Sequence, residues 1–229
     1  MRVDPVFLFD LDGTLVDSVY QHVLAWHEAL QEAGVELAVW RIHRRIGMSG
    51  GLLTRALLRE TGRALDEALL LRLQERHTEA YRARIGEVRA LPGARRLLAR
   101  LSEIGCAWAI ATSGRIATAG PAIELLGVPE GVPIVTRDRV PHAKPDPDLF
   151  LEAVRLLGAD VIDAVVVGDS VWDMLAARRA RMLGVGLLSG GYGTEELERA
   201  GAYRVYDDPA DLLDHLDEIG VRPERMAPG

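Results

Sequence analysis

The chain contains very little cysteine and no long hydrophobic run among its 229 residues. Its one cysteine, Cys106, excludes an intrachain disulfide. No apolar stretch approaches the roughly 18–20 residues that a membrane-spanning helix needs. Asp10 and Asp12 interrupt the apolar N-terminal segment too early for a signal peptide. We therefore expect a cytoplasmic protein that does not contact a membrane.

Positive charge is scarce relative to negative charge. The 27 Lys and Arg residues are outnumbered by 34 Asp and Glu residues, which gives a formal net charge of -7. Clustered Lys and Arg side chains bind nucleic-acid phosphates, so this balance argues against a nucleic-acid partner. A few local cations would still suffice for a small anionic substrate. The composition leaves the oligomeric state open.

Short apolar strands alternate with helical patterns over most of the chain. The hydrophobic content of 48% is sufficient for a packed core. The alternation predicts an α/β fold, in which a parallel sheet is covered by helices on both faces. The expected strands are 6–9, 106–111, 134–135, 164–167, 185–188 and 203–205.

The segment after the first strand has a different pattern. Residues 18–33, 39–46, 51–60 and 65–84 all have helical spacing, and no strand pattern appears between them. A long all-helical segment at this point is unusual for a simple alternating chain. We interpret it as an inserted helical cap, 17–89, within a core domain formed by 1–16 and 90–229.

The first strand ends in two carboxylates, in the order Asp10-Leu11-Asp12-Gly13-Thr14. Ligands of open α/β sheets bind at the carboxyl ends of the strands, and paired carboxylates there suit Mg²⁺. Asp10 is a candidate nucleophile that would form an aspartyl-phosphate. Asp12 is a candidate general acid and base. The same residues are also typical of a solvated turn.

A second polar group follows the expected strand 106–111. The hydroxyls of Thr112 and Ser113, with nearby backbone N–H groups at Gly114, would bind a phosphoryl group before the next helix. Arg115 would add positive charge at the same place. The alternative is that these residues only cap the helix.

Two further groups complete the candidate site. Lys144 lies between Pro141 and Pro145, which would hold its ammonium near Asp10 and the phosphoryl group, although an isolated lysine is usually solvated. Asp169 follows strand 164–167 and is a candidate metal ligand. Asp173, one helical turn later, would orient Asp169 or the metal's waters. The alternative reading is that these two aspartates cap a helix.

Taken together and in this order, the four groups resemble the motifs of the haloacid dehalogenase superfamily. Asp10-Leu11-Asp12-Gly13-Thr14 resembles the first motif, Thr112 the second, Lys144 the third and Gly168-Asp169-Ser170-Val171-Trp172-Asp173 the fourth. The helical insertion resembles the cap of phosphoglycolate phosphatase and β-phosphoglucomutase. The resemblance implies a Rossmann-like core of three αβα layers.

The resemblance also implies roles for individual residues. Asp10 would be the nucleophile and Asp12 the acid and base. Mg²⁺ would be held by the Asp10 carboxylate, the Asp12 backbone carbonyl and Asp169. Thr112 and Lys144 would bind the phosphoryl group. Family members that cleave carbon–halogen or carbon–phosphorus bonds lack the second aspartate, so Asp12 favours a phosphate ester.

The insertion offers three further candidate substrate contacts. His22 and Trp26 resemble positions in β-phosphoglucomutase, although ordinary helix packing explains them equally well. That enzyme carries a phosphate-binding Arg in its cap, and Gly50 stands at the matching position here. Arg45 lies nearby and is a candidate substitute.

Three functions fit this pattern. The leading hypothesis is a Mg²⁺-dependent phosphomonoesterase that acts on a small phosphate ester of the phosphoglycolate or sugar-phosphate type. A nucleotide substrate is also open. The alternative is a phosphosugar mutase of the β-phosphoglucomutase type, which the missing cap Arg disfavours. The second alternative is a non-enzymatic signalling receiver that carries phosphate on Asp10, although receivers are shorter and have no inserted cap.

Overall fold

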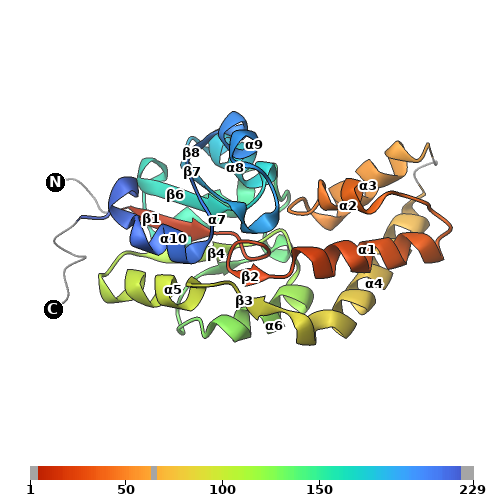
Figure 1. Ribbon diagram of the computed structural model, residues 1–229, viewed down its shortest axis with the longest axis horizontal. Coiled ribbons are helices and arrows are strands. Elements are labelled where there is room, and N and C mark those ends of the chain that lie inside the picture. Colours follow the sequence, from red (N-terminus) through yellow and green to blue (C-terminus); the bar gives the residue numbers. More distant parts are fainter. Residues whose placement is uncertain (1–4, 63–65, 223–229) are drawn as a thin grey trace.

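The computed structural model describes residues 5–62 and 66–222, and it has an α/β fold built on a six-stranded parallel sheet (Figure 1). The strand order is β5-β4-β1-β6-β7-β8. The strands are β1 Val6–Phe9, β4 Trp108–Ala111, β5 Ile134–Val135, β6 Ala164–Gly168, β7 Leu183–Leu187 and β8 Ala202–Tyr206. The predicted parallel sheet is therefore confirmed, with β1 between β4 and β6.

The central strand is buried on both sides, which explains its uninterrupted apolar sequence. Phe7 and Phe9 pack into the core on one face of the sheet, and Val6 and Leu8 pack into the core on the other, as the alternation of strand side chains requires. The first face is covered by α5 Ala94–Glu103, α6 Ile116–Leu126 and α10 Pro209–Asp214. The second is covered by α7 Asp148–Leu157 and α8 Val171–Ala180.

The helical insertion, residues 19–84, forms its own group of helices beside the carboxyl edge of the sheet (Figure 1). It consists of α1 Val19–Glu32, α2 Val39–His43, α3 Gly50–Glu60 and α4 Glu67–Arg84. Apolar side chains from all four helices form a separate buried cluster, which includes Trp26, Ile42, Leu57 and Leu73. The expected helix start at 65 lies outside the described residues.

The two chain segments that join the insertion to the sheet pair with each other. β2 Val16–Asp17 and β3 Arg89–Ala90 form an antiparallel two-stranded ribbon. No strand was expected here from the sequence, because two residues are too few to show an alternating pattern. The ribbon lies at the proposed boundaries 16/17 and 89/90, and the division into core and cap itself remains a prediction.

The rest of the chain adds short elements around the sheet. One helix, α9 Thr194–Ala200, was not expected from the sequence, and it packs against α8 and β8. Several predicted helices begin or end a few residues from their expected bounds, as is common at helix termini. No helix among the residues that the structure describes is long and apolar enough to cross a membrane. The 3₁₀ helices are η1 Ile85–Glu87, η2 Arg137–Arg139, η3 Val161–Asp163, η4 Leu188–Gly190 and η5 Leu216–Ile219.

Candidate active site

The carboxyl ends of three neighbouring strands bring the sequence-predicted polar residues together. Asp10 follows β1, Thr112 follows β4 and Asp169 follows β6, and β4 and β6 flank β1 in the sheet. Residues that are separated by more than a hundred positions in the sequence therefore meet at one edge. This convergence is the one that the strand-end argument predicts.

Lys144 is the only lysine of the chain, and its side chain is completely buried. Its Nζ lies 2.5 Å from Oδ1 of Asp10 and 2.8 Å from Oδ1 of Asp173. These contacts are ion pairs rather than well-aligned hydrogen bonds. Burial alone would lower the pKa of Lys144, but the two carboxylates outweigh it and raise the pKa above its ordinary value. Lys144 is therefore a permanent cation beside Asp10.

Three buried carboxylates lie close enough to share one ligand. Oxygen atoms of Asp10, Asp169 and Asp173 lie within 4.8 Å of one another. Thr14 Oγ1 donates a 3.0 Å hydrogen bond to Asp169. Asp173 accepts hydrogen bonds from the hydroxyl and the backbone N–H of Ser170, at 2.6 and 3.2 Å. Ser170, and not Asp169, is the N-cap of α8, so the cap explanation does not account for Asp169.

The pKa values of Asp10 and Asp169 indicate that this cluster lacks positive charge. Burial, reinforced by Asp173 and Asp12 and opposed by Lys144, raises the pKa of Asp10 to about 7. Burial, followed by the charges of Asp173 and Asp10, raises the pKa of Asp169 well above its ordinary value. One ammonium does not balance three carboxylates in a dry site. The oxygen-only donors and the surplus negative charge fit a hard divalent cation.

Asp12 faces away from this cluster and toward the helical insertion. Its Oδ1 accepts a 2.6 Å hydrogen bond from the Ser18 hydroxyl and lies 3.2 Å from Nε2 of His22. Burial would raise the pKa of Asp12, but His22 and Ser18 hold it below the ordinary value. His22 Nδ1 lies 3.1 Å from Nε2 of His77. His22 of α1 contacts Asp12 directly and His77 of α4 contacts His22, so both helices support this carboxylate.

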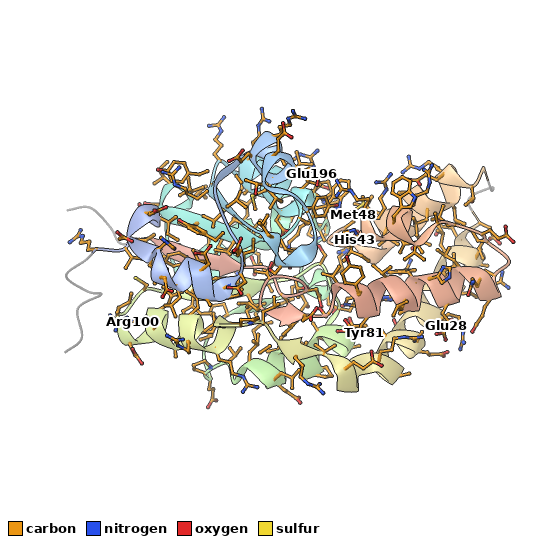
Figure 2. All side chains as sticks on the ribbon, in the orientation of Figure 1. Glu28, His43, Met48, Tyr81, Arg100 and Glu196 are labelled. Carbon is orange, nitrogen blue, oxygen red and sulfur yellow. The ribbon has the colours of Figure 1, made fainter. Side chains whose placement is uncertain are left out.

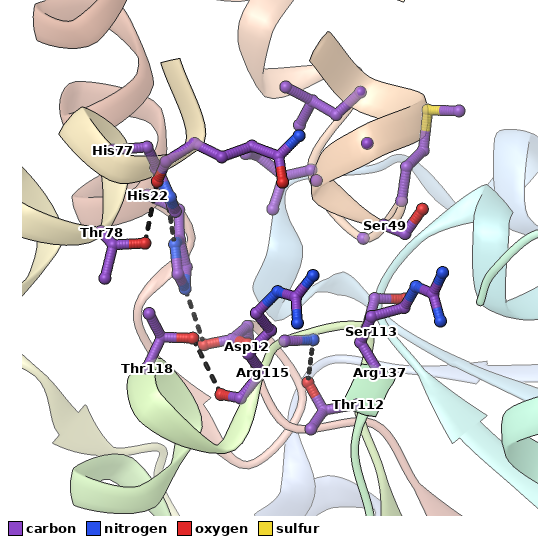
Figure 3. Close-up of a pocket in the computed structure, with 18 of the residues that line it drawn as sticks. Asp12, His22, Ser49, His77, Thr78, Thr112, Ser113, Arg115, Thr118 and Arg137 are labelled. Atoms are coloured by element: carbon purple, nitrogen blue, oxygen red, sulfur yellow. Dashed lines mark hydrogen bonds and ion pairs between the residues drawn. The ribbon is translucent and has the colours of Figure 1, made fainter. Parts of the chain in front are cut away.

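A cavity of about 200 Å³ separates the insertion from the carboxyl edge of the sheet (Figure 3). Most of the predicted substrate contacts line it: Thr112, Ser113, Gly114, Arg115, His22 and Trp26, together with Asp10 and Asp12. Lys144 is not part of the wall and lies beneath Asp10. The arrangement places a carboxylate, a hydroxyl and a second carboxylate around one small space.

Arg45 does not line this cavity, and its contact with a substrate stays a prediction. Its guanidinium forms an ion pair with Glu60 at the end of α3. Glu60 also pairs with Arg41, so the same carboxylate holds two cations of the insertion away from the site. Sequence proximity to Gly50 did not reveal the direction of the side chain.

Arg115 occupies the N-cap position of α6, but no side chain of residues 112–115 forms the capping hydrogen bond that the sequence left open. The N-terminus of α6 is bound by Asp138, which accepts a 2.8 Å hydrogen bond from the Ile116 N–H. Asp138 also pairs with Arg115 at 2.7 Å. Thr112 Oγ1 accepts a 3.0 Å hydrogen bond from the Gly114 N–H. The Ser113 hydroxyl is buried without a hydrogen-bond partner in the described part of the chain, so it remains available to a ligand.

The loop after β7 also belongs to the candidate site, although it was not expected there from the sequence. The Ser189 hydroxyl donates a 2.6 Å hydrogen bond to the Gly13 carbonyl. A Cβ at Gly190 would lie 1.7 Å from Oδ2 of Asp169. The paired glycines at 190 and 191 are the one signal that would have indicated a tight approach of the backbone.

The same loop connects this edge of the sheet to the insertion. His43 Nε2 lies 2.8 Å from the Gly190 carbonyl oxygen, and the Tyr192 hydroxyl donates a 3.0 Å hydrogen bond to the Arg44 carbonyl. Arg44 also pairs with Glu196 of α9. Figure 2 shows His43 and Glu196 at this junction between the insertion and the core.

Comparisons with known proteins agree on one family. The model of the haloacid dehalogenase-like hydrolase family matches residues 5–181. Hexitol phosphatase A of Escherichia coli (strain K12) is 34% identical over 176 residues, which cover 76% of this chain and 78% of that protein. Phosphoglycolate phosphatase of Agrobacterium fabrum is 34% identical over 193 residues, 82% of each chain.

Solved structures give the same result. A hydrolase from Pseudomonas syringae is 54% identical, has a TM-score of 0.93, and the match covers 95% of this chain and 100% of that chain. A putative beta-phosphoglucomutase from Bacteroides vulgatus is 22% identical with a TM-score of 0.83, over 93% of this chain and 88% of that chain. The second likeness shows the fold alone.

Proposed function

The chain belongs to the haloacid dehalogenase-like hydrolase family, and from this premise we propose that it is a Mg²⁺-dependent phosphomonoesterase. It would hydrolyse a small phosphorylated metabolite through an aspartyl-phosphate intermediate. The observation that carries the proposal is the position of Asp10, which is paired with Lys144, adjoins Asp169 and opens into the same cavity as Thr112 and Asp12.

In the first step, a carboxylate oxygen of Asp10 attacks phosphorus and the bond to the ester oxygen breaks. Two anions must approach each other, so the charge of the Asp10 carboxylate has to be offset. Lys144 supplies a fixed positive charge 2.5 Å from Asp10. The hydroxyl of Thr112 would donate to a phosphoryl oxygen from the wall of the cavity. Asp10 and the phosphoryl group are thereby joined in a covalent intermediate.

Asp12 would move the protons of both steps. It gives a proton to the leaving oxygen, then takes one from the water that attacks the phospho-Asp10 group and restores the free carboxylate. Its depressed pKa means that Asp12 is ionised in the resting protein. A phosphate dianion brought against it would raise its pKa, so proton uptake would accompany substrate binding.

Asp10, Asp169 and the backbone carbonyl of Asp12 would hold the metal ion. When bound, Mg²⁺ would neutralise charge on the phosphoryl oxygens and on Asp10. Asp173 is already engaged by Lys144 and Ser170, so it would position Lys144 and the cluster from behind. The alternative mutase function receives no support from the cavity, because Arg45 pairs with Glu60. The family match sets the receiver alternative aside.

Replacing Asp10 tests the mechanism directly. We expect Asp10→Asn to lower Mg²⁺-dependent turnover of 4-nitrophenyl phosphate by roughly a thousandfold or more, because the amide is a poor nucleophile. Asp160→Asn is the matched control, since Asp160 is exposed and caps nothing with its side chain. Undiminished turnover by Asp10→Asn would refute the proposal.

A cytoplasmic location stays a prediction, which cell fractionation would test.

A further inference from the structure

We propose that the cavity selects phosphate monoesters whose leaving group is a small uncharged polyol or monosaccharide, and that it disfavours a leaving group with a carboxylate or a second phosphate. This inference rests on the proposed phosphomonoesterase function and names its substrate class. It follows from how charge, hydrogen-bonding groups and apolar surface are divided between the two walls of the cavity.

Charge is confined to the wall that the sheet edge provides, which we call the floor. The floor carries Asp10, Asp12, Arg115 and Arg137. Figure 3 shows Arg115 and Arg137 on the same side as Thr112 and Ser113. Arg115 pairs with Asp138, and Arg137 donates to the Val140 carbonyl. Both cations therefore lie at the end of the cavity where the phosphoryl group would bind.

The opposite wall, which the insertion provides and which we call the roof, is uncharged by comparison. Among the residues that the structure describes, the roof contains no lysine, arginine, aspartate or glutamate. Burial, followed by the neighbouring His22, lowers the pKa of His77 well below its ordinary value, so that His77 is neutral. A carboxylate or a second phosphate placed against this wall would lose its hydration without gaining a cation.

The roof does offer unused hydrogen-bonding groups. Only 5% of the Ser49 surface is exposed, and its hydroxyl has no partner in the described part of the chain. Ser49 occupies the N-cap position of α3, yet its side chain makes no capping hydrogen bond. The amide of Gln74 is likewise unpaired among the described residues, and the Thr78 hydroxyl donates only to the Gln74 carbonyl, at 2.9 Å. Such groups suit the hydroxyls of a polyol.

The remaining roof surface is apolar and open. Trp26 stacks on His77 with ring centroids 4.1 Å apart. A Cβ at Gly50 would lie 3.8 Å from the Trp26 ring, and a Cβ at Gly51 would meet nothing within 4 Å. The two glycines thus leave space beside the indole for the carbon skeleton of a sugar. The cavity of about 200 Å³ is smaller than the roughly 300–1,000 Å³ of pockets for drug-sized ligands, which disfavours a nucleotide.

A substrate series with the intact protein and Mg²⁺ tests the inference. The probes are sorbitol 6-phosphate, 2-phosphoglycolate, fructose 1,6-bisphosphate and adenosine 5′-monophosphate. We expect kcat/KM for sorbitol 6-phosphate to exceed the other three by about tenfold or more. A preference for phosphoglycolate or the bisphosphate overturns the inference while leaving the phosphomonoesterase function intact. Failure to hydrolyse every ester, including 4-nitrophenyl phosphate, would overturn both.

Two roof variants show whether these residues contact the leaving group. We expect Ser49→Ala and Gln74→Leu each to raise KM for sorbitol 6-phosphate roughly three- to tenfold, the effect of one lost hydrogen bond. The loss in kcat/KM should be several-fold smaller for 4-nitrophenyl phosphate, whose ring makes no such bond. Equal losses on both substrates would overturn the assignment. Thermal melting identifies a variant that is merely destabilised.

A gain of charge on the roof provides the complementary test. Gly51 has no positive φ and faces open space, so it accepts a side chain. Gly51→Arg should improve kcat/KM for 2-phosphoglycolate relative to sorbitol 6-phosphate by about tenfold, because it supplies the missing cation. Gly51→Gln is the uncharged control of similar length and should not do so. If both variants change the ratio equally, charge on the roof does not determine selectivity.

Discussion

Gly190 illustrates how tightly single residues are placed around the carboxylate cluster. Its backbone lies against Oδ2 of Asp169, whereas Thr14 donates to Oδ1, and the Gly190 carbonyl oxygen contacts His43. The backbone of Gly13 also lies close to this carboxylate. Its φ is +82, and a Cβ at this position would lie only 2.6 Å from Asp169. The close approach of these two glycine backbones therefore restricts the position of the Asp169 carboxylate.

We expect Gly190→Ala to weaken metal binding. The added Cβ would displace the Asp169 carboxylate, so the Mg²⁺ concentration for half-maximal activity should rise by about tenfold or more. Titration of activity with MgCl₂ measures this. Gly120→Ala is the control, because Gly120 lies within α6 and an added Cβ there meets nothing within 4 Å. An unchanged Mg²⁺ requirement in Gly190→Ala would contradict the role given to Asp169.

Residues at strand ends were predictable from sequence, and residues placed by helix packing were not. Asp10, Thr112 and Asp169 each follow an apolar run, and the geometry of a parallel sheet brings such positions together. His77 meets His22 only because α4 packs on α1 in one particular rotation, which helical spacing does not specify. The ion pair of Arg45 with Glu60 was unpredictable for a related reason, since it depends on how α3 packs.

At the scale of elements, α1 and α4 are joined by stacked aromatic rings. His22 and Trp26 of α1 stack on Tyr81 and His77 of α4, with ring centroids 3.8 and 4.1 Å apart. His22, which belongs to this stack, also contacts the Asp12 carboxylate. The packing of two insertion helices therefore sets the position of the candidate general acid and base.

The depressed pKa of His77 predicts a pH dependence of stability. An unfolded chain takes up a proton on this residue below about pH 6.5, whereas the folded protein resists it, so the contribution of His77 to the free energy of unfolding should fall as the pH drops below that value. The loss is at most about 1.4 kcal/mol per pH unit for one group. Denaturant unfolding between about pH 5 and pH 8 measures it. The free energy of unfolding of the parent, relative to that of His77→Gln, should fall as the pH drops, and a difference that stays constant with pH would contradict this role.

The length of an element decided whether the sequence revealed it. β1 and β6 are continuous apolar runs and were predicted to within one residue at each end. The two-residue strands β2 and β3 owe their pairing to the way the chain enters and leaves the insertion, and they have no pattern of their own. The helix α9 lacks a long apolar face and buries only Leu197, so its spacing gave little signal.

At the scale of the whole molecule, the sheet edge and the insertion close on the cavity from two sides. The β2–β3 ribbon joins them at one place, and the contacts of His43 and Arg44 with the loop after β7 join them at another. The buried carboxylates lie between these connections. Their charge balance therefore affects the stability of the entire fold.

The stabilisation of the fold by a bound metal ion should depend on pH. In metal-free protein the pKa of Asp10 is raised to about 7, so from about pH 4 to 7 the folded state keeps a proton that the unfolded chain has lost. The contribution of Asp10 to the stability of the metal-free protein should therefore fall as the pH rises through this window. A bound cation displaces the proton, so Mg²⁺ should raise the melting temperature more at about pH 8 than at about pH 6. Thermal melts with MgCl₂ or with EDTA test this.

The Asp10→Asn variant provides the control for that measurement. Without a titrating group at this position, the pH dependence of the Mg²⁺ effect should flatten. An equal Mg²⁺ effect at both pH values in the parent protein would contradict the linkage.

Because Lys144 is the only lysine and is sealed between Asp10 and Asp173, the exterior of the folded protein presents no lysine amine. Reagents that acylate, biotinylate or crosslink lysines should leave the native side chains untouched and react only once the fold opens. Isotope labelling of lysine would, for the same reason, give one side-chain NMR signal, located at the candidate active site and free of overlap.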